Sequence, residues 1–341
     1  MNILLTLNSA FVRPALVLME SLYANHIHTQ LVFYVVHSDL TEDDRRLLSD
    51  YCVGRQLQLH MIKQDSAPFA ALRTSAPFPA EVYFRMLAHI YTPESVDRVL
   101  YLDADVLCNG SLRELYHMDF EGNYLIACTS EPEYTQDREA FLRNWDASKA
   151  ARGKYFNSGV LLINCRLLRE KGIGLQDYLE AAGKTDGSYL FDQGLLNLVF
   201  SQKTLLLPSE QYNYRYGSYF FRNRGKTEQI PPCRAKLIHF AGEVCPYKPW
   251  DLVLEDDELE QYQTQLIHFP HAPDFIINRD INDLCRLWWD YAKRTEVYPR
   301  LLLEMQAKKE WFKRGIYGYL TRLIHAVNTP YFQRKAREEP K

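Results

Sequence analysis

The first 130 residues constrain the fold most, because short aliphatic or β-branched runs alternate there with segments of helical periodicity. The runs predict strands over residues 2–7, 31–36, 57–62 and 98–102. Apolar residues at helical spacing over 16–23 predict a helix, and Thr41 with Asp44 predicts a capping box that opens a second one. Strands that alternate with helices are typical of βαβ units, so an α/β fold with a Rossmann-like sheet flanked by helices is expected.

The pattern changes after residue 155. Further apolar runs predict strands in a mixed layout over residues 159–164, 204–208 and 235–240. A helix is expected over 191–200. After Trp250 the chain becomes acidic (LEDDELEQY) and then loses strand character. We therefore expect a main domain over residues 1–250 and a helical C-terminal region over 251–341.

Composition excludes several classes of protein. A chain of 341 residues with 47% hydrophobic content can bury a sizeable core. The seven cysteines show neither CxxC pairs nor zinc-like spacing, so reduced thiols are expected. No apolar run approaches the ~20 residues of a transmembrane helix, and no signal peptide is recognisable. The expected compartment is the cytoplasm.

Charge is distributed unevenly along the chain. The net charge is -3, but residues 306–341 contain nine Lys or Arg and three Glu (net +6), so the remainder carries -9. This acidic body argues against nucleic acid as a partner. The basic, aromatic tail predicts a helix that binds an anionic membrane surface and places the protein peripherally at its inner face. The alternative is a helix that packs on the main domain.

Two carboxylates follow the predicted strand at 98–102. In extended chain alternate residues face one side, so Asp103 and Asp105, separated by Ala104, can point to the same place. Open α/β sheets bind ligands at the carboxyl ends of their strands. Two anions held there repel each other unless a cation joins them, and a hard divalent ion also accepts phosphate oxygens. We predict a metal site for a diphosphate; a solvated turn, a helix cap and a dehalogenase-type phosphatase are the alternatives.

A histidine and a lysine extend this prediction. His239 lies in the predicted strand over 235–240, and Lys248 follows nearby. An imidazole beside two carboxylates favours Mn²⁺, with Mg²⁺ as the second choice. Lys248 would offer the diphosphate a compact positive charge. Taken alone, His239 is better explained as a core or surface histidine.

Six segments occur in the order found in glycosyltransferase family 8, which the chain resembles over residues 1–250. They are ILLTLN at 3–8, YFRML at 83–87, LDADVL at 102–107, FNSGVLLIN at 156–164, FDQGLLN at 191–197, and HFAG with KPW at 239–250. The family comprises retaining enzymes, among them bacterial lipopolysaccharide galactosyl- and glucosyltransferases and glycogenin. The resemblance implies a GT-A type nucleotide-diphospho-sugar transferase fold with a helical C-terminal appendage. It also implies transfer of a hexose, glucose or galactose, from a UDP-sugar to a saccharide or glycolipid acceptor.

The resemblance further implies roles for individual residues. The metal ligands would be Asp103, Asp105 and His239. The donor nucleotide and diphosphate would be contacted by Thr6, Leu7, Asn8, Arg85, Ala104, Gly242 and Lys248. The donor sugar would be surrounded by the catalytic residues Asn157, Asp192 and Gln193. Of these, Gln193 is the candidate beneath the anomeric carbon, and because an amide is a poor nucleophile, front-face substitution is favoured over double displacement.

Without the resemblance, simpler explanations hold for some of these residues. Asn157 is then a turn residue before a strand, and Asp192 a helix cap. Three other functions also remain open at this point: metal-dependent nucleotidyl transfer, non-catalytic binding of a nucleotide sugar, and self-glycosylation of a surface tyrosine.

Overall fold

The computed structural model describes residues 1–74, 79–129, 155–184, 191–215, 234–241, 248–251 and 279–314. The chain divides into two compact units, Met1–Ala241 and Gly242–Lys341. The domain boundary near residue 250 stays a prediction.

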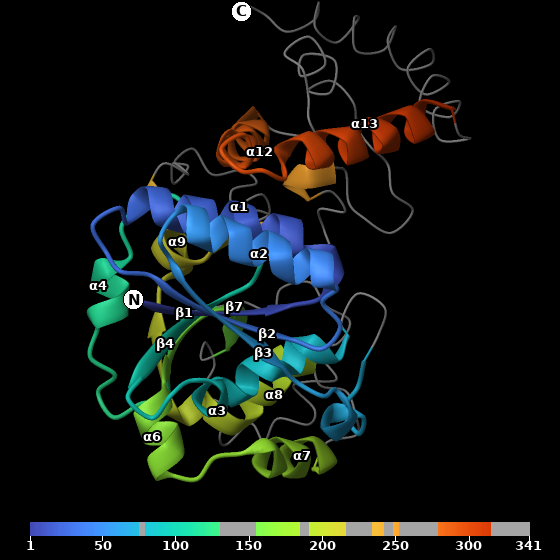
Figure 1. Cartoon of the computed structure of the whole chain (residues 1–341). Coiled ribbons are helices and arrows are strands. Elements are labelled where there is room, and N and C mark those ends of the chain that lie inside the picture. Colours follow the sequence, from blue (N-terminus) through green and yellow to red (C-terminus); the bar gives the residue numbers. More distant parts are fainter. Residues whose placement is uncertain are drawn as a thin grey trace, which may run out of the picture. The chain divides into compact units, whose positions relative to one another are not determined.

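A seven-stranded mixed sheet forms the centre of the first unit, with strand order β3-β2-β1-β4-β7-β6-β8 (Figure 1). The strands are β1 (Asn2–Leu7), β2 (Val32–His37), β3 (Gln58–Lys63), β4 (Arg98–Leu102), β6 (Leu125–Thr129), β7 (Phe156–Asn164) and β8 (Thr204–Leu207). Strands β3, β2, β1 and β4 run parallel to one another, whereas β7 is antiparallel to β4 and β6. The predicted α/β class with a mixed sheet is confirmed.

Helices cover both faces of this sheet. On one face lie α1 (Val12–Asn25) and α2 (Glu42–Gly54), and on the other α3 (Ala88–Tyr91), α6 (Cys165–Glu170), α7 (Leu175–Gly183) and α8 (Phe191–Phe200) (Figure 1). The shorter helices of the unit are α4 (Arg113–His117), α9 (Ser209–Tyr212), and the 3₁₀ turns η1 (Ser9–Phe11), η2 (Ala67–Phe69), η3 (Ala80–Leu87) and η4 (Ser201–Lys203). The capping box that opens α2 is confirmed. The Thr41 hydroxyl accepts from Asp44 N at 3.1 Å, and the Asp44 carboxylate accepts from Thr41 N.

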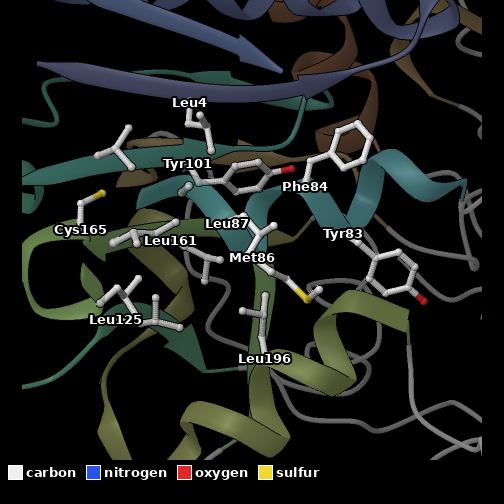
Figure 2. Packing of buried hydrophobic residues seen from close by; sticks show 14 of the residues in the cluster. Leu4, Tyr83, Phe84, Met86, Leu87, Tyr101, Leu125, Leu161, Cys165 and Leu196 are labelled. Carbon is white, nitrogen blue, oxygen red and sulfur yellow. The ribbon is translucent and has the colours of Figure 1, made fainter. Parts of the chain in front are cut away.

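The main hydrophobic core lies between the sheet and the helical layer that contains η3 and α8. All nine residues of β7 are buried, as expected of a central strand covered on both faces. Its apolar run therefore does not alternate with polar residues. Figure 2 shows how side chains from the sheet, among them Leu4, Tyr101 and Leu161, pack against Phe84 and Leu196 of the helical layer.

A second, three-stranded sheet brings distant segments together. Its order is β5 (Val106–Cys108), β10 (Leu237–His239), β9 (Tyr214–Arg215). In the antiparallel pairing of β10 with β5, His239 lies opposite Val106. Since β5 begins directly after the Asp-Ala-Asp segment, this register carries His239 to the two aspartates.

The described part of the second unit is helical. It contains η6 (Pro249–Asp251), α12 (Arg279–Ala292) and α13 (Tyr298–Arg314). The indole of Trp289 donates to the Pro249 carbonyl at 2.7 Å, and the ring of Trp288 packs against those of Trp250 and Trp289. Among the described residues, no helix is long and apolar enough to cross a membrane. Most of the predicted membrane-binding tail, residues 315–341, lies outside the described residues.

Candidate metal and donor site

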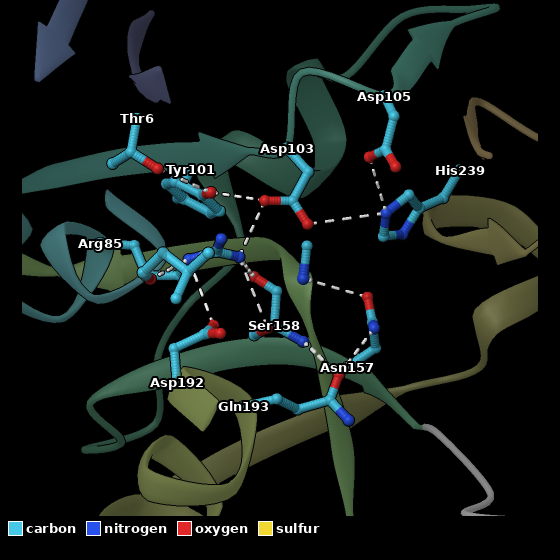
Figure 3. A network of polar contacts seen from close by, with 12 residues as sticks. Thr6, Arg85, Tyr101, Asp103, Asp105, Asn157, Ser158, Asp192, Gln193 and His239 are labelled. Atoms are coloured by element: carbon cyan, nitrogen blue, oxygen red, sulfur yellow. Dashed lines mark hydrogen bonds and ion pairs between the residues drawn. The ribbon is translucent and has the colours of Figure 1, made fainter. Parts of the chain in front are cut away.

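Three side chains converge at the carboxyl end of β4. Asp103 and Asp105 lie between β4 and β5, and His239 ends β10 (Figure 3). The His239 Nε2 atom lies 3.1 Å from Asp105 Oδ1 and 3.6 Å from Asp103 Oδ2. One ligand atom from each of the three residues lies within 4.8 Å of the others, a spacing that suits a single cation. The structure thus brings the three residues together, and their role as metal ligands stays a prediction.

The imidazole of His239 fits the role of a metal ligand. The side chain is 1% exposed, and its Nδ1 lies 2.8 Å from Asn213 Oδ1. Its Nε2 has no hydrogen-bond partner among the described residues and faces the two carboxylates. A buried nitrogen without a partner is costly, and a divalent cation would satisfy it. Two carboxylate oxygens with one imidazole nitrogen are donors that suit Mn²⁺.

The backbone of Gly159 packs closely against this cluster. An added Cβ would lie 2.2 Å from His239 Cε1 and 2.6 Å from Asp103 Oδ2, closer than any Cβ contact allows. The backbone also takes part, because Asp103 N donates to Gly159 O at 2.9 Å. No role for Gly159 was predicted from the sequence. A glycine inside an apolar strand often indicates that another group approaches the strand backbone closely.

Arg85 is a buried cation that joins two carboxylates. Its Nη1 lies 2.8 Å from Asp103 Oδ1, and its Nε lies 3.3 Å from Asp192 Oδ2. The guanidinium stacks over the ring of Tyr101, with Cζ 4.4 Å from the centroid. Burial by itself would lower the pKa of Arg85, but Asp103 and Asp192 raise it above its usual value, so the group keeps its charge. Burial raises the pKa of Asp192 although Arg85 opposes this shift.

Tyr101 fixes the orientation of Asp103. Its hydroxyl donates to Asp103 Oδ1 at 2.5 Å and lies 3.2 Å from Thr6 Oγ1. The phenol has one proton, which goes to the carboxylate, so Thr6 is the donor in the second bond. Oδ1 of Asp103 thus interacts with Tyr101 and Arg85, which leaves Oδ2 directed at His239.

The other predicted nucleotide contacts lie near this edge or outside the described residues. Leu7 and Ala104 are buried, and Asn8 caps η1 by accepting from Ala10 N. Gly242 lies outside the described residues, and Lys248 belongs to the second unit. The roles of all these residues in nucleotide binding stay predictions.

Asn157 and Gln193 form an amide pair beside the metal cluster. Antiparallel pairing places Val160 of β7 opposite Leu102 of β4, so Gly159 lies next to Asp103, and Asn157 precedes it by two residues. Gln193 Oε1 accepts from Asn157 Nδ2 at 2.8 Å and from the backbone N of Ser158 at 3.2 Å.

Hydrogen bonds hold Gln193 and the rest of α8 against β7 and the residue before it. Gln193 Nε2 donates to the Tyr155 hydroxyl at 2.9 Å. One turn later, Asn197 Oδ1 accepts from Phe156 N at 3.0 Å, and Asn197 Nδ2 donates to Phe156 O at 2.8 Å. The helix begins with Phe191 at φ 42°, in the left-handed region. Such backbone strain costs of order 1–3 kcal/mol and gathers at functional sites.

Several residues of the site are absent from the sequence-based prediction. They are Tyr101, Ser158, Gly159 and Asn213. Ser158 and Gly159 lie inside the FNSGVLLIN segment, where a motif was visible. No local pattern marks Asn213, whose role follows from the pairing of β9 with β10.

The chain is similar in sequence and fold to several known proteins. The model of the family described as Glycosyl transferase family 8 matches residues 2–252. Lipopolysaccharide 1,2-glucosyltransferase of Escherichia coli is 30% identical over 245 residues, which are 69% of this chain and 70% of that protein. Lipopolysaccharide 1,3-galactosyltransferase of Salmonella typhimurium is 26% identical and aligns over 64% of each chain. The crystal structure of galactosyltransferase LgtC with donor and acceptor sugar analogs superimposes with a TM-score of 0.66 at 21% identity, covering 90% of this chain and 100% of that one.

Proposed function

Because the chain belongs to glycosyl transferase family 8 and is a hexosyltransferase with a GT-A fold, we propose that it moves glucose or galactose from a UDP-sugar, with a divalent metal and with retention of anomeric configuration. The observation that carries the proposal is the Asp103, Asp105 and His239 cluster, in which a buried imidazole nitrogen faces two carboxylates at the end of a sheet strand. The acceptor is proposed to be a saccharide or glycolipid, since two of the similar proteins are named lipopolysaccharide 1,2-glucosyltransferase and lipopolysaccharide 1,3-galactosyltransferase.

The charge of the cluster supports a divalent cation. With their carboxylates ionised, Asp103 and Asp105 carry two negative charges, and the neighbouring ion pair of Arg85 with Asp192 adds no net charge. The sum of -2 equals the charge that a divalent ion would neutralise. A cation held by Asp103, Asp105 and His239 would supply Lewis-acid stabilisation of the departing diphosphate. The imidazole among the donors supports Mn²⁺ over Mg²⁺.

The hydrogen bonds of Gln193 support front-face substitution. Its Oε1 already accepts two hydrogen bonds, and its Nε2 donates to Tyr155. An amide oxygen whose lone pairs are both engaged is a still weaker nucleophile than a free amide. Gln193 would therefore not act as a nucleophile, and the acceptor hydroxyl would attack from the face that the diphosphate leaves.

We expect Mn²⁺-dependent release of UDP when the protein is incubated with UDP-glucose or UDP-galactose, and less with UDP-N-acetylglucosamine. Phosphorus NMR identifies the product, since pyrophosphate would instead show nucleotidyl transfer. Chelation of the metal should abolish turnover. Proton NMR of the product formed with a saccharide acceptor tests retention, and an inverted anomer would contradict it. Intact mass after incubation with donor alone tests self-glycosylation.

The basic tail is proposed to hold the enzyme at an anionic membrane surface, where the enzyme would have access to a glycolipid acceptor. Its net charge of +6 over residues 306–341 supports this, because each basic residue near such a surface contributes about 1 kcal/mol. The full chain should float with vesicles rich in anionic lipid, and a chain ending at residue 305 should not. Equal flotation of both would end this proposal.

A further inference from the structure

We propose that Asn213 is a positioning residue that keeps the ring proton of His239 on Nδ1, so that the Nε2 lone pair stays open toward Asp103 and Asp105. The inference deepens the proposed function and rests on His239 being a metal ligand. It follows from a chain of hydrogen bonds in which every donor and acceptor is fixed by the one before (Figure 3).

The chain starts from a backbone group whose role cannot change. The backbone N of Gly159 lies 3.0 Å from the Asn157 atom assigned as Oδ1, and an amide N–H only donates. That side-chain atom must therefore be the oxygen. The opposite atom is the nitrogen, which agrees with its 2.8 Å contact to Gln193 Oε1. The backbone N of Ser158 fixes Gln193 Oε1 as an oxygen in the same way, at 3.2 Å.

The orientation of Asn213 follows from that of Asn157. One side-chain atom of Asn213 lies 2.8 Å from Asn157 Oδ1, so it must be the donor Nδ2. The other is then Oδ1, which lies 2.8 Å from His239 Nδ1. Because a carbonyl oxygen only accepts, Nδ1 carries the proton, and a ring with a single proton leaves Nε2 bare.

The alternative tautomer would block the metal site. A proton on Nε2 would face the carboxylates of Asp105 and Asp103, 3.1 and 3.6 Å away, and would leave no nitrogen for a cation. Asn213 opposes this form, because a bare Nδ1 would place two acceptors 2.8 Å apart. Burial strengthens the constraint: Asn213 and His239 are each 1% exposed, so water has little access to replace the amide.

Tertiary structure holds Asn213 in place. It follows α9 directly, with its backbone N donating to Ser209 O at 3.1 Å. The next two residues form β9, which pairs with β10 so that Arg215 lies beside His239. The amide chain therefore runs from Gln193 of α8 through Asn157 of β7 and Asn213 to the metal cluster.

The test reads the ring directly. Nitrogen-15 NMR of the metal-free protein, labelled at histidine, reports which ring nitrogens carry protons, and the His239 signals are assigned by their loss in His239→Gln. Nδ1 should be protonated in the wild type. In Asn213→Leu, a ring with one proton should carry it on Nε2, and Mn²⁺ affinity measured by EPR without donor should fall about 10–100-fold, the usual effect of removing the partner of a metal-bound histidine.

Two further variants separate orientation from general stability. Asn213→Asp keeps an oxygen toward Nδ1 but loses the donor to Asn157 Oδ1, so it should retain the Nδ1 proton and bind Mn²⁺ better than Asn213→Leu. Asn164→Ala removes another buried asparagine, which caps α6 and donates to Asn123 O, and should leave Mn²⁺ affinity unchanged. If Asn213→Leu does not fold, Asn213→Ala carries the same expectation.

The outcomes distinguish this inference from the proposed function. A bare Nδ1 in the wild-type ring, or wild-type Mn²⁺ affinity in the folded Leu or Ala variant, would overturn the role of Asn213. If the wild type binds no Mn²⁺ while its Nδ1 is protonated, the proposed metal site fails, and Asn213 orients the ring without serving a metal.

Discussion

Asp105→Asn is expected to lower both Mn²⁺ affinity and metal-dependent UDP release by at least ~100-fold, since it removes a charged ligand and with it electrostatic stabilisation of the leaving group. Arg85 lies 2.8 Å from Asp103 and already offsets part of that carboxylate's charge. Loss of the Asp105 charge therefore reduces the cluster from -2 to -1. A divalent ion then gains much less from entering the site.

The same variant makes an opposite prediction for the metal-free protein. Carboxylates within 4.8 Å of each other repel when no cation separates them. Asp105→Asn should therefore raise the metal-free melting temperature, whereas added Mn²⁺ should raise that of the wild type only. The conservative control is Asp50→Asn on the exposed side of α2. It should change neither the metal-free melting temperature nor the rise caused by Mn²⁺. Metal-dependent turnover at the wild-type rate in Asp105→Asn would refute the role of Asp105 as a metal ligand.

Gly159→Ala is expected to disable the site by crowding alone, without removing any ligand. The new methyl group would lie 2.2 Å from His239 Cε1 and 2.6 Å from Asp103 Oδ2. Both ligands, or the β7 backbone, must move, and overpacking of this kind costs about 1–3 kcal/mol of stability. We expect Mn²⁺ affinity to fall at least ~10-fold and UDP release to fall further, because ligand displacements of 1 Å have large effects on catalysis.

Gly54→Ala is the matched control for this substitution. Gly54 ends α2, and an added Cβ there meets nothing within 4 Å. It should leave metal binding unchanged and have little effect on, or slightly raise, the melting temperature. Isothermal titration with Mn²⁺ and thermal unfolding of both variants provide the comparison. Unchanged Mn²⁺ affinity in folded Gly159→Ala would mean that the ligands do not need the geometry described above.

Local features were predictable because each depends on neighbours in sequence. The strands β1 to β4, helix α8 and the Thr41 capping box all follow from periodicity and end signals. The Asp-Ala-Asp segment was recognisable since a buried strand precedes it. Family membership followed from the order of six segments, and the family match over residues 2–252 confirms it.

The α/β class, the order of the elements and the acidic pair could be predicted from the sequence alone, because burial and helix capping follow from short-range patterns. The assembly of the site depends on the tertiary structure. The register of β10 on β5 brings His239 to Asp105, the contact with Tyr101 directs the hydroxyl of Thr6, and the close approach of Gly159 and the amide of Asn213 shape the metal cluster. These contacts join residues far apart in the chain, and their geometry depends on strand pairing and packing that no local pattern encodes.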